Sequence, residues 1–333
     1  KTFAHLHVPT SCRHCEHPHC MADCPPNVIH RGPDDHQLVE FSQGLIGFHR
    51  LAIMDLSDHG RQPFQSSKNN FLVCNGEIYN YLALKKECTG HTFISHSDCE
   101  VLLPLYEQWG IKKLVESLDA EYALVIWDGK KQKLLAARDP MGIRPLFYGH
   151  TKEGKMAFAS EVKALVDFCE EIIPFPPGHF YDGENFHCYL DLTHVQTYHQ
   201  IPQVEILKGI NSRLVSAVEK RLQSDAEVGF LLSGGLDSSL VCAIAQRLNK
   251  LKPIRTFSIG MPDDAIDSKY AQEVATFIGA NHTNVTMTKV EVLDVLKKVI
   301  WHLETWDITT IRASIGMFLV CEYIREKTNI KVL

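Results

Sequence analysis

The segment Ser233-Gly234-Gly235-Leu236-Asp237-Ser238-Ser239 lies between a short apolar run and an amphipathic stretch. This order predicts a glycine-rich loop between a β-strand and an α-helix, where backbone N–H groups converge on an anion. The glycines let the backbone approach phosphate oxygens, the serine hydroxyls add donors, and Asp237 suits a magnesium ion opposite phosphate. The spacing matches neither common nucleotide loop, Gly-x-x-x-x-Gly-Lys-Ser/Thr or Gly-x-Gly-x-x-Gly. The alternative is a serine-capped helix start after a glycine turn.

Helices and strands alternate on both sides of this loop. The expected order is helix 204–223, strand 229–232, helix 239–248, strand 254–260, helix 268–279, strand 283–287, helices 292–304 and 314–326, and strand 329–333. Such alternation predicts a parallel, doubly wound sheet with right-handed crossovers. We place this α/β domain at residues 205–333 and expect it to be incomplete.

The chain before it has a different texture. From about residue 44, short apolar runs separated by Asp-Gly, Glu-Gly and Asn-Gly steps indicate strands and turns. Two helices are expected among them, at 101–110 and 162–169. Together they predict an α+β layered domain that ends near residue 192, with a connector at about 193–204.

Three local clusters in this first half suggest a pocket for an amino acid. Arg50 follows an apolar strand, residues 75–80 (Asn-Gly-Glu-Ile-Tyr-Asn) leave another strand, and Ser-Asp-Cys-Glu at 97–100 opens a helix. An arginine can hold a carboxylate, a carboxylate can hold an ammonium, and an Asn-Gly turn can aim an amide and an N–H at an oxyanion. Taken singly, the three also fit a surface salt bridge, a hairpin turn and a helix N-cap.

Composition excludes several classes of protein. The chain has 333 residues, enough for two domains, with 45% hydrophobic and 22% charged residues, as in ordinary globular proteins. No apolar run approaches the ~18 residues that a membrane span needs, and no Lys/Arg block offers a nucleic-acid footprint. We therefore expect neither a membrane nor a nucleic acid as partner. Eleven cysteines are too sparse for a disulfide scaffold, which favours a reducing, cytoplasmic location.

The combined motifs resemble a known family. The order of residues 30–34 (His-Arg-Gly-Pro-Asp), Arg50, 75–80, 97–100 and 138–146 (Arg-Asp-Pro-Met-Gly-Ile-Arg-Pro-Leu) resembles the glutaminase domain of class II amidotransferases. The loop at 233–239 resembles the pyrophosphate-binding motif of ATP pyrophosphatases, and with residues 304–314 the whole resembles glutamine-hydrolysing asparagine synthetases. The resemblance implies an N-terminal-nucleophile glutaminase αββα sandwich at 31–192, followed by a doubly wound ATP pyrophosphatase domain truncated at its C-terminus.

The resemblance also implies an activity, a ligase reaction that forms a carbon–nitrogen bond. Aspartate would be activated by ATP with Mg²⁺ as a β-aspartyl adenylate and would capture ammonia from glutamine, giving asparagine, glutamate, AMP and pyrophosphate. The partners would be these small molecules, and the assembly a homodimer. Two alternatives stay open at this stage: a relative similar to β-lactam synthetases, and an iron–sulfur redox or binding module on a degenerate amidotransferase body.

Roles for individual residues come from the same resemblance. Arg50, in the segment Arg50, Leu51, Ala52, Ile53 and Met54, would hold the glutamine α-carboxylate, Glu77 and Asp98 its amino group, and Asn75 with Gly76 would form the oxyanion hole. Thr309, Thr310 and Arg312 would line the synthetase site. ATP and pyrophosphate would contact Leu232, Ser233, Gly234, Gly235, Asp237, Ser238 and Ile259, with Asp237 also on magnesium.

A cluster of cysteines stands at the start of the printed chain. Cys12, Cys15, Cys20 and Cys24 have C-x2-C-x4-C-x3-C-P spacing and resemble half of a two-cluster ferredoxin module, so residues 1–30 are expected as a separate Cys-rich segment. The ligand set implied is that of a four-iron four-sulfur cluster. A zinc site that includes His14, His17 or His19 is the competing hypothesis, and no metal is the third. The family would place a cysteine nucleophile at the mature N-terminus, where this chain has Lys1.

Overall fold

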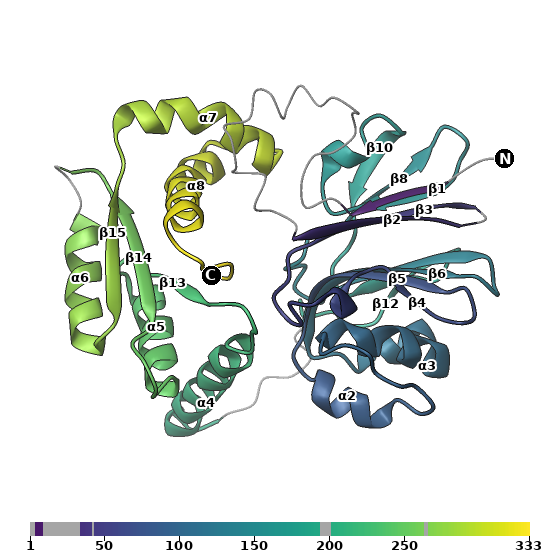
Figure 1. Cartoon of the computed structure of the whole chain (residues 1–333), viewed down its shortest axis with the longest axis horizontal. Helices are drawn as coiled ribbons and strands as arrows, with labels where there is room; N and C mark the ends of the chain where they lie inside the picture. Colours follow the sequence, from purple (N-terminus) through teal and green to yellow (C-terminus); the bar gives the residue numbers. More distant parts are fainter. Residues whose placement is uncertain (1–3, 9–33, 42, 194–200, 263–265) are drawn as a thin grey trace. The chain divides into compact units, whose positions relative to one another are not determined.

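The computed structural model describes residues 4–8, 34–41, 43–193, 201–262 and 266–333. The chain divides into two compact units, residues 1–198 and 199–333. Each unit is described separately below (Figure 1).

A six-stranded antiparallel sheet forms the centre of the first unit. Its order is β12-β11-β7-β6-β5-β4. The strands are β4 (Phe64–Gln65), β5 (Phe71–Ile78), β6 (Ala120–Asp128), β7 (Lys133–Arg138), β11 (His179–Tyr181) and β12 (Phe186–Cys188). Strands β5 and β6 pair along their whole length, which places Glu77 directly opposite Glu121.

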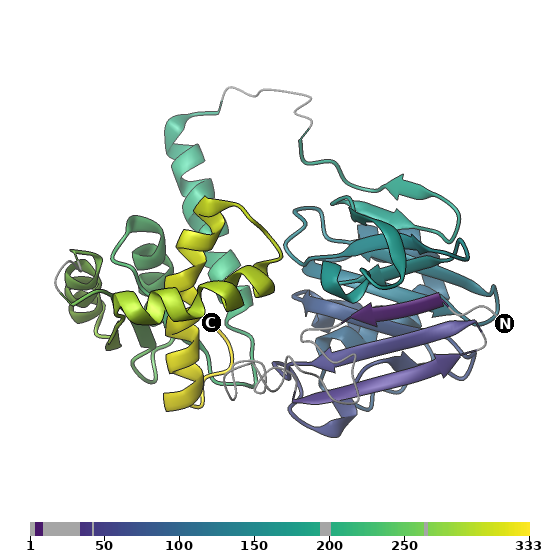
Figure 2. The same ribbon diagram turned by 90° about the horizontal axis from the view of Figure 1, so that it is seen from above.

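A second layer of strands lies over one face of this sheet. It contains β1 (Ala4–Val8), β2 (Asp35–Phe41) and β3 (Gly44–Arg50) in the order β1-β3-β2, and β8 (Phe147–Thr151), β9 (Met156–Ala159) and β10 (Cys169–Pro174) in the order β10-β8-β9. Figure 2 shows β1 to β3 side by side in purple. Apolar side chains from both layers, including Phe48, Val125 and Phe158, form the core between them, as expected for stacked sheets that bury one face each.

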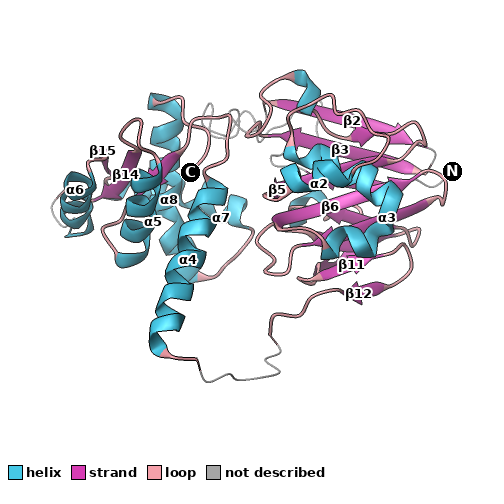
Figure 3. Cartoon of the chain, turned by 90° about the horizontal axis from the view of Figure 1, so that it is seen from below, coloured by secondary structure: helices cyan, strands magenta, loops and turns pink. Residues whose placement is uncertain are grey.

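Helices α2 (Tyr81–Glu87) and α3 (Leu102–Glu116) cover the other face of the six-stranded sheet (Figure 3). Because side chains alternate along a strand, Leu72 and Leu124 point to these helices, whereas Val73 and Val125 point to the second layer of strands. The predicted glutaminase-type sandwich is thereby confirmed. Helix α3 is longer than the predicted 101–110 and continues through a kink at Gly110, where φ is +78°.

The predicted helix at 162–169 is wrong. The described chain has only the 3-10 turn η3 (Val162–Ala164) there, and Cys169 already belongs to strand β10. Ala164 and Leu165 are buried against Ala157 and Ala159 of β9. Ala164 and Leu165 therefore cover β9 from within a single turn, and the chain does not continue as a helix after it.

The second unit is a doubly wound α/β domain. Strands β13 (Gly229–Leu231), β14 (Arg255–Gly260) and β15 (Asn281–Thr286) are parallel in the order β13-β14-β15. The predicted strand at 329–333 forms an isolated parallel bridge, Val332 with Val228, on the free edge of β13. The sheet therefore grows in both directions from β13, which confirms the predicted topology and makes the carboxyl end of β13 a topological switch point.

Helices cover both faces of this sheet. The helices are α4 (Gln203–Arg221), α5 (Leu236–Leu248), α6 (Ile266–Ile278), α7 (Lys289–Leu303) and α8 (Ile308–Lys327). Residues of α4, α5 and α6 share one core with Phe230 and Leu232, whereas α8 packs with Leu231 and Phe257 on the opposite face. Helix α7 packs against α8. Among the described helices of the chain, none is long and apolar enough to cross a membrane.

Candidate functional site

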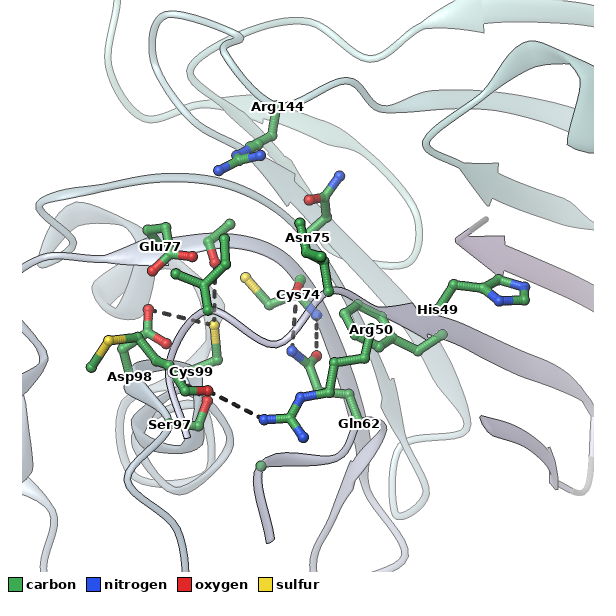
Figure 4. A pocket seen from close by; sticks show the side chains of 16 residues that line it. His49, Arg50, Gln62, Cys74, Asn75, Glu77, Ser97, Asp98, Cys99 and Arg144 are labelled. Atoms are coloured by element: carbon green, nitrogen blue, oxygen red, sulfur yellow. Dashed lines mark hydrogen bonds between the residues drawn. The ribbon is translucent and has the colours of Figure 1, made fainter. Parts of the chain in front are cut away.

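A cavity of about 140 Å³ opens in the first unit, where the end of β3, the second half of β5 and the 3-10 turn η2 (Asp98–Val101) meet (Figure 4). It gathers the predicted residues Arg50, Leu51, Ile53, Met54, Asn75, Gly76, Glu77 and Asp98. Ala52 is 3% exposed and stands outside this lining; its N–H donates to the Asp34 carboxylate at 2.9 Å. Residues far apart in the sequence therefore converge on one site.

Arg50 is buried at the end of β3, and its guanidinium shapes the loop that follows it. It donates to the backbone carbonyl of Ser57 at 2.7 Å, to that of Met54 at 3.2 Å, and to that of Asp55. A side chain on Gly60 would collide with this guanidinium. Since an arginine has five N–H donors, Arg50 can anchor the loop and still present donors to a carboxylate. Its role as the α-carboxylate ligand stays a prediction.

Asn75 and Gly76 occupy the part of β5 that lines the cavity. The Asn75 amide donates to the Ser160 hydroxyl at 3.5 Å. A Cβ on Gly76 would lie 2.6 Å from the Tyr122 Cα, so only glycine lets β5 approach β6 this closely. The predicted Asn-Gly pair therefore sits within the paired strand β5 instead of in a hairpin turn, which removes that alternative reading.

Glu77 and Asp98 place two carboxyl groups on the same wall. Asp98 is 5% exposed and accepts the Ile78 N–H at 2.6 Å. Burial, together with the neighbouring Asp98 carboxyl, raises the pKa of Glu77 to about 8. Burial also raises the pKa of Asp98, although the hydrogen bond from Ile78 opposes this. Neither carboxyl has a basic partner within ion-pair distance in the described chain. A bound cation would stabilise both charges.

Several residues that line the cavity or support its loop were missed by the sequence reasoning. Gln62 holds β5 by accepting from the Cys74 N–H at 2.7 Å and donating to the Cys74 carbonyl at 3.1 Å. Asp55 ties the loop to the segment before η2 by accepting the His96 N–H at 2.8 Å. Arg144 also lines the cavity. Gln62 and Asp55 carried no sequence signal, whereas Arg144 stood in a quoted motif without an assigned role.

The glycine loop of the second unit precedes α5 at the switch point of the sheet. Ser233 and Ser238 share a hydrogen bond of 2.9 Å between their hydroxyls, and the Ser238 hydroxyl also accepts the Ser233 N–H at 3.2 Å. Gly234 has φ +82°, and a Cβ there would lie 2.6 Å from Tyr270 of α6. Gly235 is the N-cap of α5. The first N–H groups of α5, which have no intrahelical partners, therefore follow directly on the loop and can donate to an anion.

The residues present fit a magnesium ion that travels with phosphate. Asp237 is exposed in the first turn of α5, beside the loop. Mg²⁺ commonly takes one or two protein carboxylates together with water and substrate phosphates. Within the described ranges, no group of three or more His, Cys, Asp or Glu could hold a metal by itself.

The remaining predicted residues lie at the same edge of this sheet or beneath it. Leu232 is 1% exposed and packs into the core with α5 and α6, and Ile259 lies near the end of β14, against α8. Thr309, Thr310 and Arg312 are exposed in the first turns of α8. Since α8 returns the chain to the amino edge of the sheet, its start lies on the carboxyl edge with the glycine loop.

The four clustered cysteines, Cys12, Cys15, Cys20 and Cys24, lie outside the described residues. The structure therefore places no ligand set for an iron–sulfur or zinc site.

Comparison with known proteins identifies the family. A model described as the glutamine amidotransferase domain matches residues 10–200, more than half of the chain, and the chain belongs to this family. The match includes the segment of the four clustered cysteines. A second model, described as asparagine synthase, matches residues 209–333.

Similar curated proteins carry asparagine synthetase names. A probable glutamine-hydrolyzing asparagine synthetase of Acanthamoeba polyphaga mimivirus is 42% identical, with 93% of this chain and 61% of that relative covered. Glutamine-hydrolyzing asparagine synthetase 2 of Arabidopsis thaliana is 38% identical, and the glutamine-hydrolyzing asparagine synthetase of Zea mays is 39% identical. Each of these two alignments covers 89% of this chain and 52% of the relative. The chain thus spans little more than half the length of these relatives.

Proposed function

We propose that this chain contains the glutaminase unit and the ATP-binding unit of an enzyme that makes asparagine. The first unit hydrolyses the side-chain amide of glutamine to glutamate and ammonia. In the second, the β-carboxylate of aspartate displaces pyrophosphate from ATP, and ammonia then displaces AMP from the β-aspartyl adenylate. The names of the relatives support this reaction, and the two matching families do not favour a β-lactam synthetase-like enzyme or a redox module.

A pair of carboxyl groups in the first unit, that of the half-buried Glu77 and that of the buried Asp98, carries the proposal. Glu77 and Asp98 line a cavity that also contains Arg50 and the Asn75-Gly76 amide groups. A free amino acid brings one ammonium and one carboxylate, and the cavity offers acidic groups for the first and a guanidinium for the second. The amides of Asn75 and Gly76 could then meet the reacting carbonyl.

Direct binding tests this assignment without depending on turnover. Isothermal titration calorimetry of the 333-residue chain should detect L-glutamine at pH 8.5, no binding of D-glutamine, and loss of L-glutamine binding in Glu77→Gln. The matched control Glu170→Gln changes an exposed glutamate of the same unit and should leave the affinity unchanged. Failure of the unaltered chain to bind L-glutamine between pH 6.5 and 9 would refute the glutaminase assignment.

The ATP site of the second unit is proposed at the carboxyl edge of its sheet. The glycine loop, the α5 N-terminus, Asp237 and the start of α8 share that edge, which is where ligands of doubly wound sheets bind. Ser238→Ala should weaken Mg²⁺–ATP binding because it removes the hydroxyl that closes the loop. Ser224→Ala, a control before β13 whose hydroxyl donates to Ala226, should not. Equal effects would argue against this location.

Further points from the sequence are proposals of the same kind. We propose a cytoplasmic location, Mg²⁺ as the companion of ATP, and a homodimer. The cluster Cys12, Cys15, Cys20 and Cys24 remains a candidate four-iron four-sulfur site. Iron content and broad visible absorption of protein purified without oxygen would support it, and a colourless, iron-free preparation would count against it.

A further inference from the structure

An ion pair on the cavity wall has no role in the proposal above. Arg144 Nη2 lies 2.9 Å from Glu121 Oε1, and both side chains are half-buried. Glu121 of β6 stands directly opposite Glu77 of β5. Two like charges at such a position repel each other, so the guanidinium compensates one of two facing carboxylates.

The backbone that carries Arg144 is firmly held. Arg138 donates to the Arg144 carbonyl and to the Gly142 carbonyl, both at 2.7 Å. The Asp139 carboxylate, 1% exposed, accepts the N–H groups of Ile143 at 3.0 Å and Arg144 at 3.1 Å. The guanidinium is therefore presented to the cavity from a rigid loop, in the same region as Glu77 and Asn75 (Figure 4). Its Nε atom is buried and makes no hydrogen bond to any described residue.

We propose that Arg144 is a positioning residue for the ammonium of a bound amino acid: it pairs with Glu121 and leaves the opposing Glu77 carboxylate to the ligand. The inference rests on the proposed glutamine-binding role of the cavity. If Arg144 paired with Glu77 instead, it would occupy the place of the ammonium. If it were absent, Glu121 and Glu77 would repel each other and Glu77 would keep its proton.

The charges around Glu77 agree with this arrangement. It faces Asp98 of η2, Glu121 of β6, the Arg144 guanidinium and, next to Asp98, the buried thiol of Cys99. Burial and Asp98 raise the pKa of Glu77, Arg144 lowers it and Glu121 raises it. The Arg144 guanidinium is thus the one positive charge that acts on Glu77 among three carboxyl groups, and the ligand ammonium adds another beside Glu77.

Two neutralising substitutions should move the binding profile in opposite directions. In Arg144→Gln, the pH at which L-glutamine affinity reaches half its maximum should rise by roughly one unit, so that affinity at pH 7 falls about tenfold. In Glu121→Gln the same midpoint should fall. Arg144→Lys keeps the charge and should restore the midpoint. The control Lys133→Gln breaks the remote Lys133–Glu184 ion pair of the same unit and should leave it unchanged.

Calorimetric titrations with L-glutamine from pH 6.5 to 9 separate the outcomes. Opposite shifts in the two variants support the inference. Shifts of the same sign, or none, in variants that bind L-glutamine would overturn it while the proposed function stands. Absence of binding by the unaltered chain would instead overturn the proposed function. If Arg144→Gln fails to fold by circular dichroism, Glu121→Gln decides alone: a lower midpoint supports the role and an unchanged or higher one refutes it.

Discussion

Glu77→Gln should stabilise the first unit at alkaline pH, in addition to abolishing ligand binding. The pKa of Glu77 is about 8 in the folded chain, against 4.5 for an exposed glutamate. Between these values the unfolded chain has released the proton and the folded chain still holds it, so stability falls as pH rises and the loss is complete above pH 8. The difference between the two pKa values, about 3.5, corresponds to at most about 5 kcal/mol of folding free energy lost by ionising Glu77.

The expected gain is smaller than this bound because Asp98 titrates together with Glu77. We expect roughly half, about 2–3 kcal/mol above pH 8, since glutamine cannot ionise and does not incur the loss. In differential scanning calorimetry at pH 8.5, the midpoint of the first unit should rise by about 5–10 °C. At pH 5 the variant and the unaltered chain should differ by less than about 1 kcal/mol.

Two further variants make the measurement decisive. Leu124→Ala removes a fully buried side chain of β6, costs about 2–5 kcal/mol, and identifies which transition belongs to the first unit. The exposed control Glu170→Gln should shift neither transition at either pH. A stabilisation by Glu77→Gln that is equal at pH 5 and pH 8.5, or absent at pH 8.5, would refute the argument from the buried charge.

Three other substitutions and one matched control, Gly279→Ala, test the two units. Gly234→Ala combines a positive φ with a collision against α6. It should lower the free energy of unfolding by about 2–3 kcal/mol or more and abolish Mg²⁺–ATP binding measured by calorimetry. The control Gly279→Ala, where φ is positive but the space is open, should lower the free energy of unfolding by only about 1–2 kcal/mol. Thr288→Ala removes the capping box that Thr288 forms with Glu291 at the start of α7 and should cost about 1 kcal/mol in urea unfolding. Asp139→Ala removes a buried carboxylate that accepts the N–H groups of Met141, Ile143 and Arg144, and should lower the first unit's thermal midpoint by an amount equivalent to about 3 kcal/mol.

The results that would contradict these expectations differ. Retained ATP affinity in Gly234→Ala would place the nucleotide away from the loop. A Thr288→Ala chain as stable as the original would mean that the cap is replaced by water. An unchanged midpoint in Asp139→Ala would show that the loop carrying Arg144 does not depend on its carboxylate.

Much of the fold followed from local patterns. Most strands and helices of the second unit were predicted to within a few residues, because their apolar residues follow a clear period. The start of α8 was missed: the helix begins at Ile308, before the predicted 314. The helix predicted at 162–169 was wrong because its apolar residues at helical spacing also suit a single turn packed on a sheet. These residues are Ala164, Leu165, Phe168 and Cys169. The extension of α3 to Glu116 was missed because Gly110 resembles a helix end, yet the chain resumes its helix beyond the kink.

For the candidate site, the residues within motifs could be predicted from the sequence. The hydrogen bonds that hold the surrounding loop and strand in place could not. Arg50, Asn75, Glu77 and Asp98 line one cavity as the motifs suggested. That Arg50 also anchors its own loop depends on carbonyls that no side-chain pattern reveals. Gln62 is held against β5 only because the chain folds back on that strand.

The amino-acid sequence by itself determined the two kinds of sheet, the glycine loop at the start of α5 and the identity of the polar residues around the cavity, because these depend on local periodicity and on short motifs. Only the tertiary structure decided the charge relations among them. Strand register places Glu121 against Glu77, and a distant loop brings Arg144 to pair with one of the two. Charges interact through distance and burial, and both are set by segments that are remote along the chain.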